Sequence, residues 1–379
     1  MTETLFRLLK TDRGSGARTG LLALNHGTVK TPCFMPVGTN ASVKAMKNRD
    51  LEEMGISLIL GNTYHLSLRP GAEAIGLAGG LHSFMGWKRN ILTDSGGYQI
   101  FSLAPFRKIE EGGARFKSHI DGSQHVLTPE RVIELQTAFG SDIMMPLDVC
   151  TAPGISRQEA RDALLLTTRW LARSKTAWEG LAAPMQGRLF GIMQGNFHRD
   201  LRTESAEGIL ALDLPGYAIG GLSVGEEFPV FQEFLRHSAG LLPADKPRYL
   251  MGIGTPRYIL EAVEAGIDLF DCVFPTRTAR NALVFTCDGP LSLRAEKNKL
   301  DFGPLDPQCA CETCRNHSRG YLRHLFKARE IQAAVLATGH NLFFIQDLIR
   351  GIQRAIEEDS FPAFKDRFLS RYEGNAENE

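Results

Sequence analysis

Short apolar runs recur eight times along the chain, and a polar residue or a glycine closes each of them. The runs occupy residues 32–38, 57–62, 90–97, 141–149, 189–196, 216–226, 248–256 and 267–275. Runs of this length, bounded by turn residues, are typical of strands that are buried on both faces. The pattern therefore predicts eight strands of a parallel sheet.

Most gaps between these runs carry the apolar spacing of helices, as at 128–140, 156–177 and 229–242. Thr128 and Pro129 predict a helix start, with an N-cap residue before a proline at the first helical position, and Thr255-Pro256 repeats this pair. Alternating strands and helices predict an α/β fold, and a count of eight favours a closed TIM (β/α)8 barrel over an open doubly wound sheet. No glycine-rich phosphate or dinucleotide fingerprint opens the first unit, which weakens the open sheet further.

Three cysteines lie close together at Cys309, Cys311 and Cys314, and His340 follows them. Three thiolates and one imidazole suit a tetrahedral zinc ion with no open position, and such a site is structural. The Cys-x-Cys spacing is tighter than the gap usual in zinc fingers. The alternative is a set of core thiols beside a surface histidine, but the surrounding segment is polar. We expect one structural Zn²⁺ per chain.

Two segments depart from the alternation of strands and helices. Residues 105–127 are rich in glycine, and we interpret them as a β-hairpin region inserted in the barrel. After the eighth strand the alternation is lost, and His340 opens an amphipathic helix predicted over 341–358. We therefore predict a barrel domain over 1–277, which includes the N-terminal segment and the insertion. A zinc-binding subdomain and a C-terminal helix packed on the barrel are predicted over 278–379.

The composition is that of an ordinary globular protein, with 379 residues, 43% of them hydrophobic and 23% charged. No apolar run reaches the roughly 18 residues that span a bilayer, and the N-terminus lacks the apolar core of a signal peptide. Seven cysteines, three of them predicted metal ligands, argue against a disulfide framework. We expect a reducing, cytoplasmic location without membrane attachment.

Charge is distributed unevenly although the formal net charge is zero. A balanced total excludes a protein that coats nucleic acid by bulk charge. Between Arg277 and Arg329, however, ten lysines and arginines face only five acidic residues. A basic face beside a zinc site is consistent with phosphate contacts, and a solvated face without a partner is an equal alternative.

The predicted strand ends carry a distinctive set of polar residues and glycines. They are Asp94, Asp148, Gln194, Gly220 with Gly221, Gly252 with Gly254, and Asp271. Active sites of (β/α)8 barrels lie at the carboxyl ends of the strands, so three carboxylates and a carboxamide would converge on one mouth. Each residue alone has an ordinary structural reading, such as a capping turn at Asp94 or a satisfied buried acid at Asp148.

The residue types at this mouth limit its chemistry. Strands four to eight end without a histidine, so a metal hydrolase is disfavoured. Two carboxylates suit an anomeric carbon, where one attacks as a nucleophile and holds a glycosyl ester while the other moves protons. The third acid and the amide suit the edge of guanine, and Tyr98 and Met251 offer surfaces on which a base can stack. A base handled in this way must leave its stack, which favours a loop nucleotide as substrate.

Several long motifs together resemble one family. They are Asp94-Ser-Gly-Gly-Tyr-Gln, Ser118-His-Ile-Asp-Gly-Ser, Gly220-Gly-Leu-Ser-Val-Gly-Glu, Phe270-Asp-Cys-Val-Phe-Pro-Thr-Arg-Thr-Ala-Arg-Asn and Cys309-x-Cys-x-x-Cys with His340. In this order, and over nearly the whole chain, they resemble bacterial tRNA-guanine transglycosylase, also called queuine tRNA-ribosyltransferase. The resemblance implies an enzyme that exchanges guanine at the wobble position, 34, of tRNA for another base.

The resemblance also implies a role for each residue. Asp271 is the expected nucleophile, which attacks the ribose and holds the tRNA covalently, and Asp94 is the expected proton acceptor. The expected base-binding residues are Asp94, Ser95, Gly96, Gly97, Tyr98, Asp148, Gln194, Gly221, Leu222 and Met251. The expected RNA-binding residues are Gly252, Ile253, Gly254, Thr255, Pro256, Arg257, Tyr258, Thr276, Arg277, Thr278, Ala279 and Arg280. The metal ligands are the three clustered cysteines and His340.

The entering base implied by bacterial relatives is 7-aminomethyl-7-deazaguanine (preQ1). Val224 and Cys150 resemble the bacterial pocket, and the Leu222 carbonyl could accept from the aminomethyl group. Queuine, the bulkier base of animal relatives, is the alternative. The implied partners are the anticodon stem-loops of G-U-N tRNAs for Asp, Asn, His and Tyr, and a second copy of the chain. The C-terminal helix could supply that interface or pack within one subunit.

Three other readings compete with this one. A non-catalytic tRNA-binding homologue would lack the acids, whereas this chain keeps Asp94, Asp148 and Asp271. An archaeal-type relative that acts elsewhere in tRNA usually carries further C-terminal RNA-binding domains. An unrelated barrel glycosidase would explain two acids but neither the cysteine cluster nor the basic segment.

Overall fold

Eight parallel strands form a closed barrel, as the sequence predicts. The computed structural model describes residues 4–103, 107–181 and 187–374. The barrel strands are β4 (Cys33–Pro36), β5 (Leu58–Gly61), β6 (Asn90–Thr93), β10 (Ile143–Met144), β11 (Arg188–Met193), β12 (Gly216–Ile219), β13 (Arg248–Leu250) and β14 (Leu269–Cys272). They pair in chain order, and β14 returns to β4. A parallel bridge between Val37 and Leu60 joins β4 to β5 and closes the ring.

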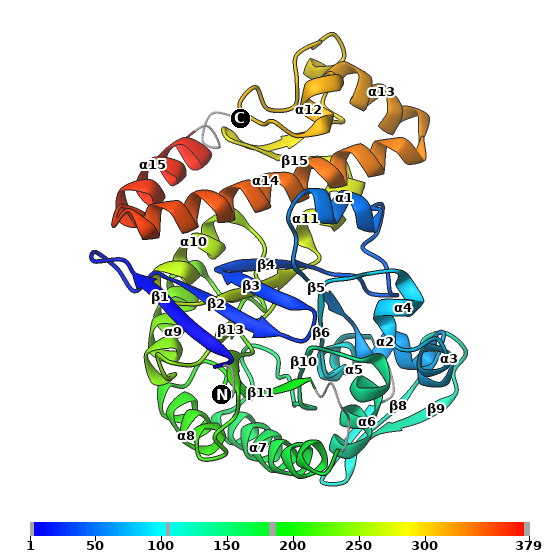
Figure 1. Cartoon of the computed structure of the whole chain (residues 1–379), viewed down its shortest axis with the longest axis vertical. Helices are drawn as coiled ribbons and strands as arrows, with labels where there is room; N and C mark the ends of the chain where they lie inside the picture. The colour runs from blue at the N-terminus through cyan, green and yellow to red at the C-terminus, as the bar shows by residue number, and fades with distance from the viewer. Residues whose placement is uncertain (1–3, 104–106, 182–186, 375–379) are drawn as a thin grey trace.

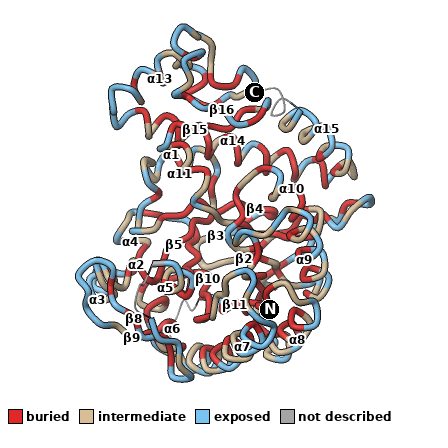
Figure 2. Tube along the Cα trace, turned by 180° about the vertical axis from the view of Figure 1, so that it is seen from behind, coloured by how far each residue is buried: buried red, intermediate tan, exposed pale blue. Residues whose placement is uncertain are grey.

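The alternation of side chains along each strand builds two layers of core. Leu58 and Leu60 of β5 point into the barrel and pack with interior residues of the other strands. Ile59, between them, belongs to the second core, which lies between the strands and the surrounding helices. This is the period of two that a strand imposes on its side chains. Figure 2 shows the strands as a buried centre inside a more exposed shell.

Helices connect the barrel strands and cover their outer face (Figure 1). They are α1 (Asn48–Glu53), α2 (Thr63–Leu68), α3 (Ala72–Leu77), α4 (Leu81–Met85), α5 (Gly97–Leu103), α6 (Pro129–Phe139), α7 (Arg157–Glu179), α8 (Arg199–Leu210), α9 (Phe228–Leu241), α10 (Pro256–Glu264) and α11 (Phe274–Arg280). The predicted start at Thr128 is confirmed, because its side chain accepts a hydrogen bond from the Arg131 N–H. Thr255 occupies the N-cap position of α10, but its side chain makes no capping bond.

An antiparallel sheet precedes the barrel. Its strands are β1 (Phe6–Thr11), β2 (Arg18–Leu24) and β3 (Gly27–Thr31). Phe6, Leu22 and Val29 pack into the same core as the interior residues of the barrel. The turn between β2 and β3 is bonded to residues at the starts of barrel strands, since the His26 N–H donates to the Asn90 side chain at 3.0 Å. The sheet therefore closes the amino end of the barrel.

The inserted region is a small antiparallel sheet of three strands, one more than a single hairpin. These strands are β7 (Arg107–Glu110), β8 (Gly113–Lys117) and β9 (Gln124–Leu127). The first residues of the predicted insertion, 105 and 106, lie outside the described residues. Ala114, Phe116 and Leu127 of this sheet are buried in the outer core of the barrel. The insertion is thus fixed to the barrel by its apolar face.

A smaller unit follows the last barrel strand. It contains β15 (Leu283–Thr286), β16 (Gly289–Ser292), the 3₁₀ turn η1 (Glu296–Asn298), α12 (Glu312–Asn316), α13 (Arg319–Ala328), α14 (Ile331–Glu357) and α15 (Phe361–Gly374). The prediction that a helix opens after His340 is wrong, because α14 begins at Ile331 and His340 lies within it. Figure 1 shows α14 running between the barrel and α12, α13 and β15 of the small unit. Its residues Ile349 and Ile352 are buried in the core shared with the barrel, so this helix packs within one subunit.

None of the described helices is both long enough and apolar enough to cross a membrane.

Candidate active site and metal centre

The predicted polar residues lie where the barrel strands end. Asp94 directly follows β6, Gln194 directly follows β11, and Asp271 is the last residue but one of β14. Asp148 follows β10 after a short extended segment. Because the strands are parallel, these ends share one rim of the barrel. The structure brings the three acids and the carboxamide to this mouth.

Asp94 is a buried carboxylate held by three donors. Its Oδ1 accepts from the Thr63 N–H at 2.8 Å, and its Oδ2 accepts from Asn62 Nδ2 at 2.6 Å and from Gln99 Nε2 at 2.8 Å. Burial raises its pKa to about 6, although these hydrogen bonds oppose the rise and the negative charge of Asp271 adds to it. A carboxyl group with this pKa can exchange protons near neutral pH.

Asp271 has one oxygen fixed and one oxygen free of hydrogen bonds. Its Oδ1 accepts from the Tyr249 hydroxyl at 2.5 Å and from the Gly252 N–H at 2.8 Å. Within the described residues, no donor reaches Oδ2. Burial raises the pKa of Asp271, and the two hydrogen bonds oppose that rise. The side chain is thus oriented by one oxygen and can present the other to a substrate.

Asp148 and Gln194 form a second pair in the mouth. Asp148 Oδ1 accepts from the Ser95 hydroxyl and Oδ2 from Gln194 Nε2, both at 2.8 Å. Burial raises the pKa of Asp148, and both hydrogen bonds oppose the rise. The Gln194 N–H donates to the Ser205 hydroxyl of α8 at 3.0 Å. A carboxylate and an amide are therefore held side by side with their planes fixed.

Glycines permit this close packing. A Cβ at Gly97 would lie 2.6 Å from both the carbonyl oxygen and Oδ1 of Asp148. A Cβ at Gly221, whose φ is +68°, would lie 2.9 Å from the Gln194 side-chain oxygen. A Cβ at Gly96, whose φ is +83°, would lie 3.2 Å from the backbone nitrogen of Tyr64. The predicted base-binding glycines are therefore needed for the shape of the mouth.

Several further residues, not predicted from the sequence, support the mouth. Tyr249 is fully buried and binds Asp271, and Asn62 binds Asp94. Arg202 of α8 is buried and donates to backbone carbonyls of the mouth, including that of Gly220. Glu226 accepts from two N–H groups of the loop after β12. Asn62 and Glu226 close two of the predicted strand runs, 57–62 and 216–226, whereas nothing in the sequence pattern marks Tyr249 or Arg202.

The two predicted stacking residues differ in exposure. Tyr98 lies on α5 with 55% of its surface exposed. Met251 is half-buried, and its N–H donates to the Ile219 carbonyl at 3.2 Å. Leu222, the predicted neighbour of the entering base, is buried. A ring sandwiched between Tyr98 and Met251 stays a prediction.

The predicted RNA-binding stretches are only partly accessible. Five of their residues are buried, namely Ile253, Gly254, Pro256, Thr276 and Ala279. Arg257 is exposed but stacks over the Phe228 ring at 3.9 Å and pairs with Glu373. Tyr258 packs edge-on against the same ring. Arg277 stays exposed and available.

The remaining cation of that stretch turns toward its own helix. Arg280 donates to the Thr276 carbonyl of α11 at 2.9 Å. Burial and the nearby charge of Arg277 lower the pKa of Arg280. Gly252, Thr255 and Thr278 retain surface exposure. Direct RNA contacts from these stretches remain a prediction.

The four predicted metal ligands come together in the small unit. The Sγ atoms of Cys309, Cys311 and Cys314 lie 3.7, 3.4 and 3.3 Å from His340 Nδ1. Sulfur–nitrogen edges of about 3.5 Å are what a tetrahedral zinc with ordinary bond lengths requires. The other ring nitrogen, Nε2, donates to the Phe285 carbonyl at 2.6 Å and so orients the ring. The cluster can hold a metal ion.

The basic segment is partly neutralised. Arg319 pairs with Asp301 at 3.0 Å, and Arg323 and Lys299 pair with Glu296. Others on the surface form no ion pair with a described residue, namely Arg277, Arg294, Arg315, Lys327 and Arg329. Free cations on this face are consistent with phosphate contacts.

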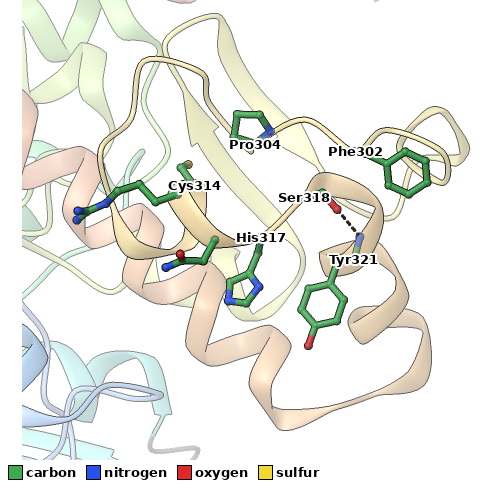
Figure 3. Close-up of a pocket in the computed structure, with 8 residues that line it drawn as sticks. Phe302, Pro304, Cys314, His317, Ser318 and Tyr321 are labelled. Carbon is green, nitrogen blue, oxygen red and sulfur yellow. Dashed lines mark hydrogen bonds between the residues drawn. The ribbon is translucent and has the colours of Figure 1, made fainter.

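A surface hollow of about 560 Å³ lies beside the cysteine cluster (Figure 3). His317 and Tyr321 line it with stacked rings whose centroids are 5.3 Å apart, and Cys314 lies at its inner side. No carboxylate lines this hollow. The paired acids of this protein therefore lie at the barrel mouth and not in this hollow.

Fold and site together define a (β/α)8 barrel with an acidic mouth and a separate thiolate cluster. The model of the queuine tRNA-ribosyltransferase family matches residues 12–374. The chain is 52% identical to a queuine tRNA-ribosyltransferase of Treponema denticola over 97% of both chains. It is 52% identical to one of Caldanaerobacter subterraneus over the full length of both, and 50% identical to one of Borrelia hermsii over 98% of this chain and 99% of the other. The chain belongs to the queuine tRNA-ribosyltransferase family.

Proposed function

We propose that this protein is a tRNA-guanine transglycosylase that replaces guanine 34 of G-U-N anticodons by double displacement. The observation that carries the proposal is the pair of acids in the mouth, the buried Asp94 and the half-buried Asp271, which lie close enough for their charges to interact. Family membership over nearly the whole chain supports the same reaction. A non-catalytic homologue would have no need of these acids.

In the first step, Asp271 Oδ2 attacks C1′ of the ribose of guanosine 34. A C–O ester bond forms as the glycosidic C–N bond breaks, and guanine leaves with the bonding electrons and takes a proton from solvent water. The hydrogen bonds from Tyr249 and Gly252 to Oδ1 fix the direction of attack. These two donors also keep Asp271 in place while it carries the tRNA.

In the second step, the entering base attacks the same carbon. Asp94 takes the proton from its N9 position while the new C–N bond forms and the ester to Asp271 breaks. General base help of this kind contributes on the order of 10²–10⁴-fold. Because the covalent intermediate separates the two steps, guanine leaves before the new base enters.

The base is read by Asp148, Gln194 and the Gly221 N–H. The Asp148 carboxylate accepts from the N–H groups of the guanine edge, and the Gln194 amide and the Gly221 N–H donate to its carbonyl oxygen. Leaving and entering bases share this edge, so one site serves both. Tyr98 and Met251 enclose the ring faces.

The entering base of the proposal is preQ1, with queuine as the alternative. Val224 is half-buried on the loop after β12, and Glu226 accepts from the N–H groups of Ser223 and Val224 at 2.5 and 2.8 Å. These bonds direct both N–H groups toward Glu226, which supports an accepting Leu222 carbonyl on the other side. A side chain at position 224 also leaves less room for queuine than glycine.

The metal of the proposal is zinc. Cys309, Cys311, Cys314 and His340 would hold it with all four positions filled, so it supplies rigidity and no reaction step. The protein's partners would be tRNAs for Asp, Asn, His and Tyr, in the cytoplasm. Arg277, beside the mouth, supports the tRNA contact through its exposed charge.

The proposal also includes a homodimer. The exposed rings of Phe302 and Tyr321 support it, because large apolar groups on a surface often mark contacts between chains. Sedimentation equilibrium at micromolar concentration should give twice the chain mass of 41.8 kDa. A single-chain mass would contradict this part of the proposal.

Labelled guanine tests the reaction. Incubated with the protein and a G-U-N tRNA, without any nucleotide cofactor, it should enter the tRNA. The Asp271→Asn variant should lose this exchange together with the tRNA–protein adduct that survives denaturing electrophoresis. An Asp213→Asn variant, altered at an exposed acid before the start of β12, at the opposite end of that strand from Gly220 and Gly221, should keep both. Exchange that is absent from the wild type would refute the function, and an adduct that persists in Asp271→Asn would refute the nucleophile.

A further inference from the structure

A buried arginine without a carboxylate partner lies behind the base-binding loop. Arg202 of α8 has no exposed surface, and no described acid lies within ion-pair distance of it. Its guanidinium donates instead to three carbonyl oxygens, those of Asn196 at 2.9 Å, Gly220 at 2.8 Å and Gly221 at 3.3 Å. Burial lowers its pKa to about 10, so it remains charged at neutral pH. A buried charge is costly, which calls for a reason for its presence.

The carbonyl of Gly220 and the N–H of Gly221 belong to one planar peptide group. In a trans peptide they point in opposite directions. When Arg202 binds the Gly220 oxygen, it therefore turns the Gly221 N–H away from the protein interior. No described residue accepts a hydrogen bond from that N–H. It is left as an oriented donor for a ligand.

The same guanidinium also joins the two loops that read the base. Asn196 lies on the loop that carries Gln194 after β11, and Gly220 and Gly221 follow β12. A Cβ at Gly220 would lie 2.8 Å from Gln194 Nε2, so the loops touch without a side chain between them. Arg202 reaches both through its planar fork of donors. Movement of either loop would break at least one of its bonds.

We propose that Arg202 is a positioning residue that aims and strengthens the Gly221 N–H at the carbonyl oxygen of the bound base. The inference rests on the proposed function, in which a guanine-like edge occupies the mouth. A cation that binds one end of a peptide group polarises it, which makes the N–H at the other end a better donor. Lysine cannot replace this arrangement, because an ammonium group lacks the planar fork.

Two bases that differ by one oxygen separate this role from general stability. The probes are 7-deazaguanine and 2-amino-7-deazapurine, which lacks the carbonyl, and calorimetry measures their binding to the full chain. Arg202→Lys should weaken 7-deazaguanine by about 10-fold or more, the usual range for a hydrogen bond made by a charged or polarised group. It should change the affinity for 2-amino-7-deazapurine by less than about threefold, because that base makes no bond to Gly221.

Arg248→Lys is the matched control. Arg248 is a half-buried arginine at the start of β13, at the far end of the barrel from the mouth, and it also donates to backbone carbonyls, those of Leu242 and Pro243. Its lysine variant should bind 7-deazaguanine like the wild type. Where Arg202→Lys does not fold by circular dichroism, Arg202→Gln, which keeps one donor group, takes its place in the same measurement.

Three outcomes decide the matter. Loss of affinity for 7-deazaguanine alone supports the proposal. Equal weakening of both bases, or an unchanged affinity for 7-deazaguanine, overturns it. Since base binding is measured without tRNA, a wild type that binds 7-deazaguanine but fails to exchange guanine into tRNA would refute the proposed function and leave the Arg202 result standing.

Discussion

At the scale of single residues, burial and hydrogen bonding act against each other on the acids of the mouth. Asp94 and Asp271 are both desolvated, which raises their pKa, and both accept hydrogen bonds, which lower it. The balance leaves Asp94 with a pKa of about 6. A base with this pKa is ionised at neutral pH yet still takes up a proton readily.

The pH dependence of exchange follows from Asp94. Its pKa is raised by burial, so the carboxylate needed as a base is present above about pH 6 and is lost as the pH falls through that value. Below it, single-turnover exchange should fall about tenfold per pH unit. Rapid-quench measurements between pH 4.5 and 8 on tRNA-saturated enzyme provide the profile. A rate that stays constant across this range would show that Asp94 is not the base.

The role of Gly97 in shaping the base site can be tested by adding a single carbon atom. In Gly97→Ala the new Cβ would press on Asp148, which cannot give way because it is bound to Ser95 and Gln194. Overpacking of this kind costs about 1–3 kcal/mol, so the affinity for 7-deazaguanine should fall by roughly 5- to 100-fold.

The control for this substitution is Gly240→Ala. Gly240 lies within α9, and its added Cβ would meet no atom within 4 Å. Both variants gain one methyl group, but only one of them gains it beside the base site. Calorimetry with 7-deazaguanine should therefore separate them, and equal affinities would show that the mouth can relax around the extra atom.

At the scale of elements, α14 links the metal cluster to the barrel. His340 lies in its first half, while Ile349 and Ile352 pack into the barrel core. The same helix packs against α11, which carries Arg277. Cys311 and Cys314 are themselves part of the apolar core of the small unit. A metal ion here would tie several short elements to one long helix.

Removal of the metal should unfold the small unit and leave the barrel folded. Structural zinc contributes on the order of 10 kcal/mol in zinc-finger peptides, and this unit has only a modest core of its own. Chelation, or Cys311→Ser, should make residues 282–330, which precede α14, sensitive to protease and abolish tRNA binding. Binding of 7-deazaguanine should persist, because its residues lie in the barrel.

Cys287→Ser is the control for the loss of a thiol. Cys287 lies in the same unit outside the cluster, and its sulfur donates to Asp306 at 3.2 Å, a bond that serine can keep. This variant should retain both protease resistance and tRNA binding. Metal-free protein that still binds tRNA would contradict the bracing role of the cluster.

The sequence predicted the barrel strands well because both faces of each strand are buried. It placed the start of α14 too late, at residue 341, directly after the poor helix formers Thr338 and Gly339, whereas the helix begins at Ile331. Tertiary packing decides there, since Ala333, Leu336 and Ala337 are buried in the small unit. The antiparallel strand β1 gave no signal, because most of its residues are exposed.

The acids of the mouth were predictable because they follow strands, whose ends share one rim. Tyr249 and Arg202 were not, because their roles depend on partners distant in sequence. Tyr249 reads as one more apolar residue of a buried strand, and only the structure places its hydroxyl on Asp271. The contacts by which Tyr249 and Arg202 hold the mouth arise from tertiary packing, and the local sequence pattern does not show them.

At the scale of the whole molecule, a neutral protein presents a locally basic face. The exposed cations of the small unit and Arg277 are balanced by acids elsewhere. This arrangement favours oriented binding of a polyanion over coating by it. Phosphate contacts set position, whereas sequence must be read by the bases.

The salt dependence of tRNA binding measures this face. Each cation that contacts a phosphate contributes about one to the slope of log affinity against log salt concentration. Arg277→Gln should weaken tRNA binding and reduce that slope by about one. Arg131→Gln, which removes a cation already paired with Glu134, should leave it unchanged. Equal slopes for wild type and Arg277→Gln would place Arg277 outside the contact.

The small antiparallel sheet of β1, β2 and β3 closes the amino end of the barrel. Phe6, Leu22 and Val29 fill that end of the packed barrel core, so a base can reach the mouth only from the rim where the strands end. Under the proposed function, the departing guanine and the arriving base must pass this rim in turn. The tRNA docks at the same rim. The shape of the barrel therefore imposes the order of exchange, because guanine must leave through the rim before the new base can enter.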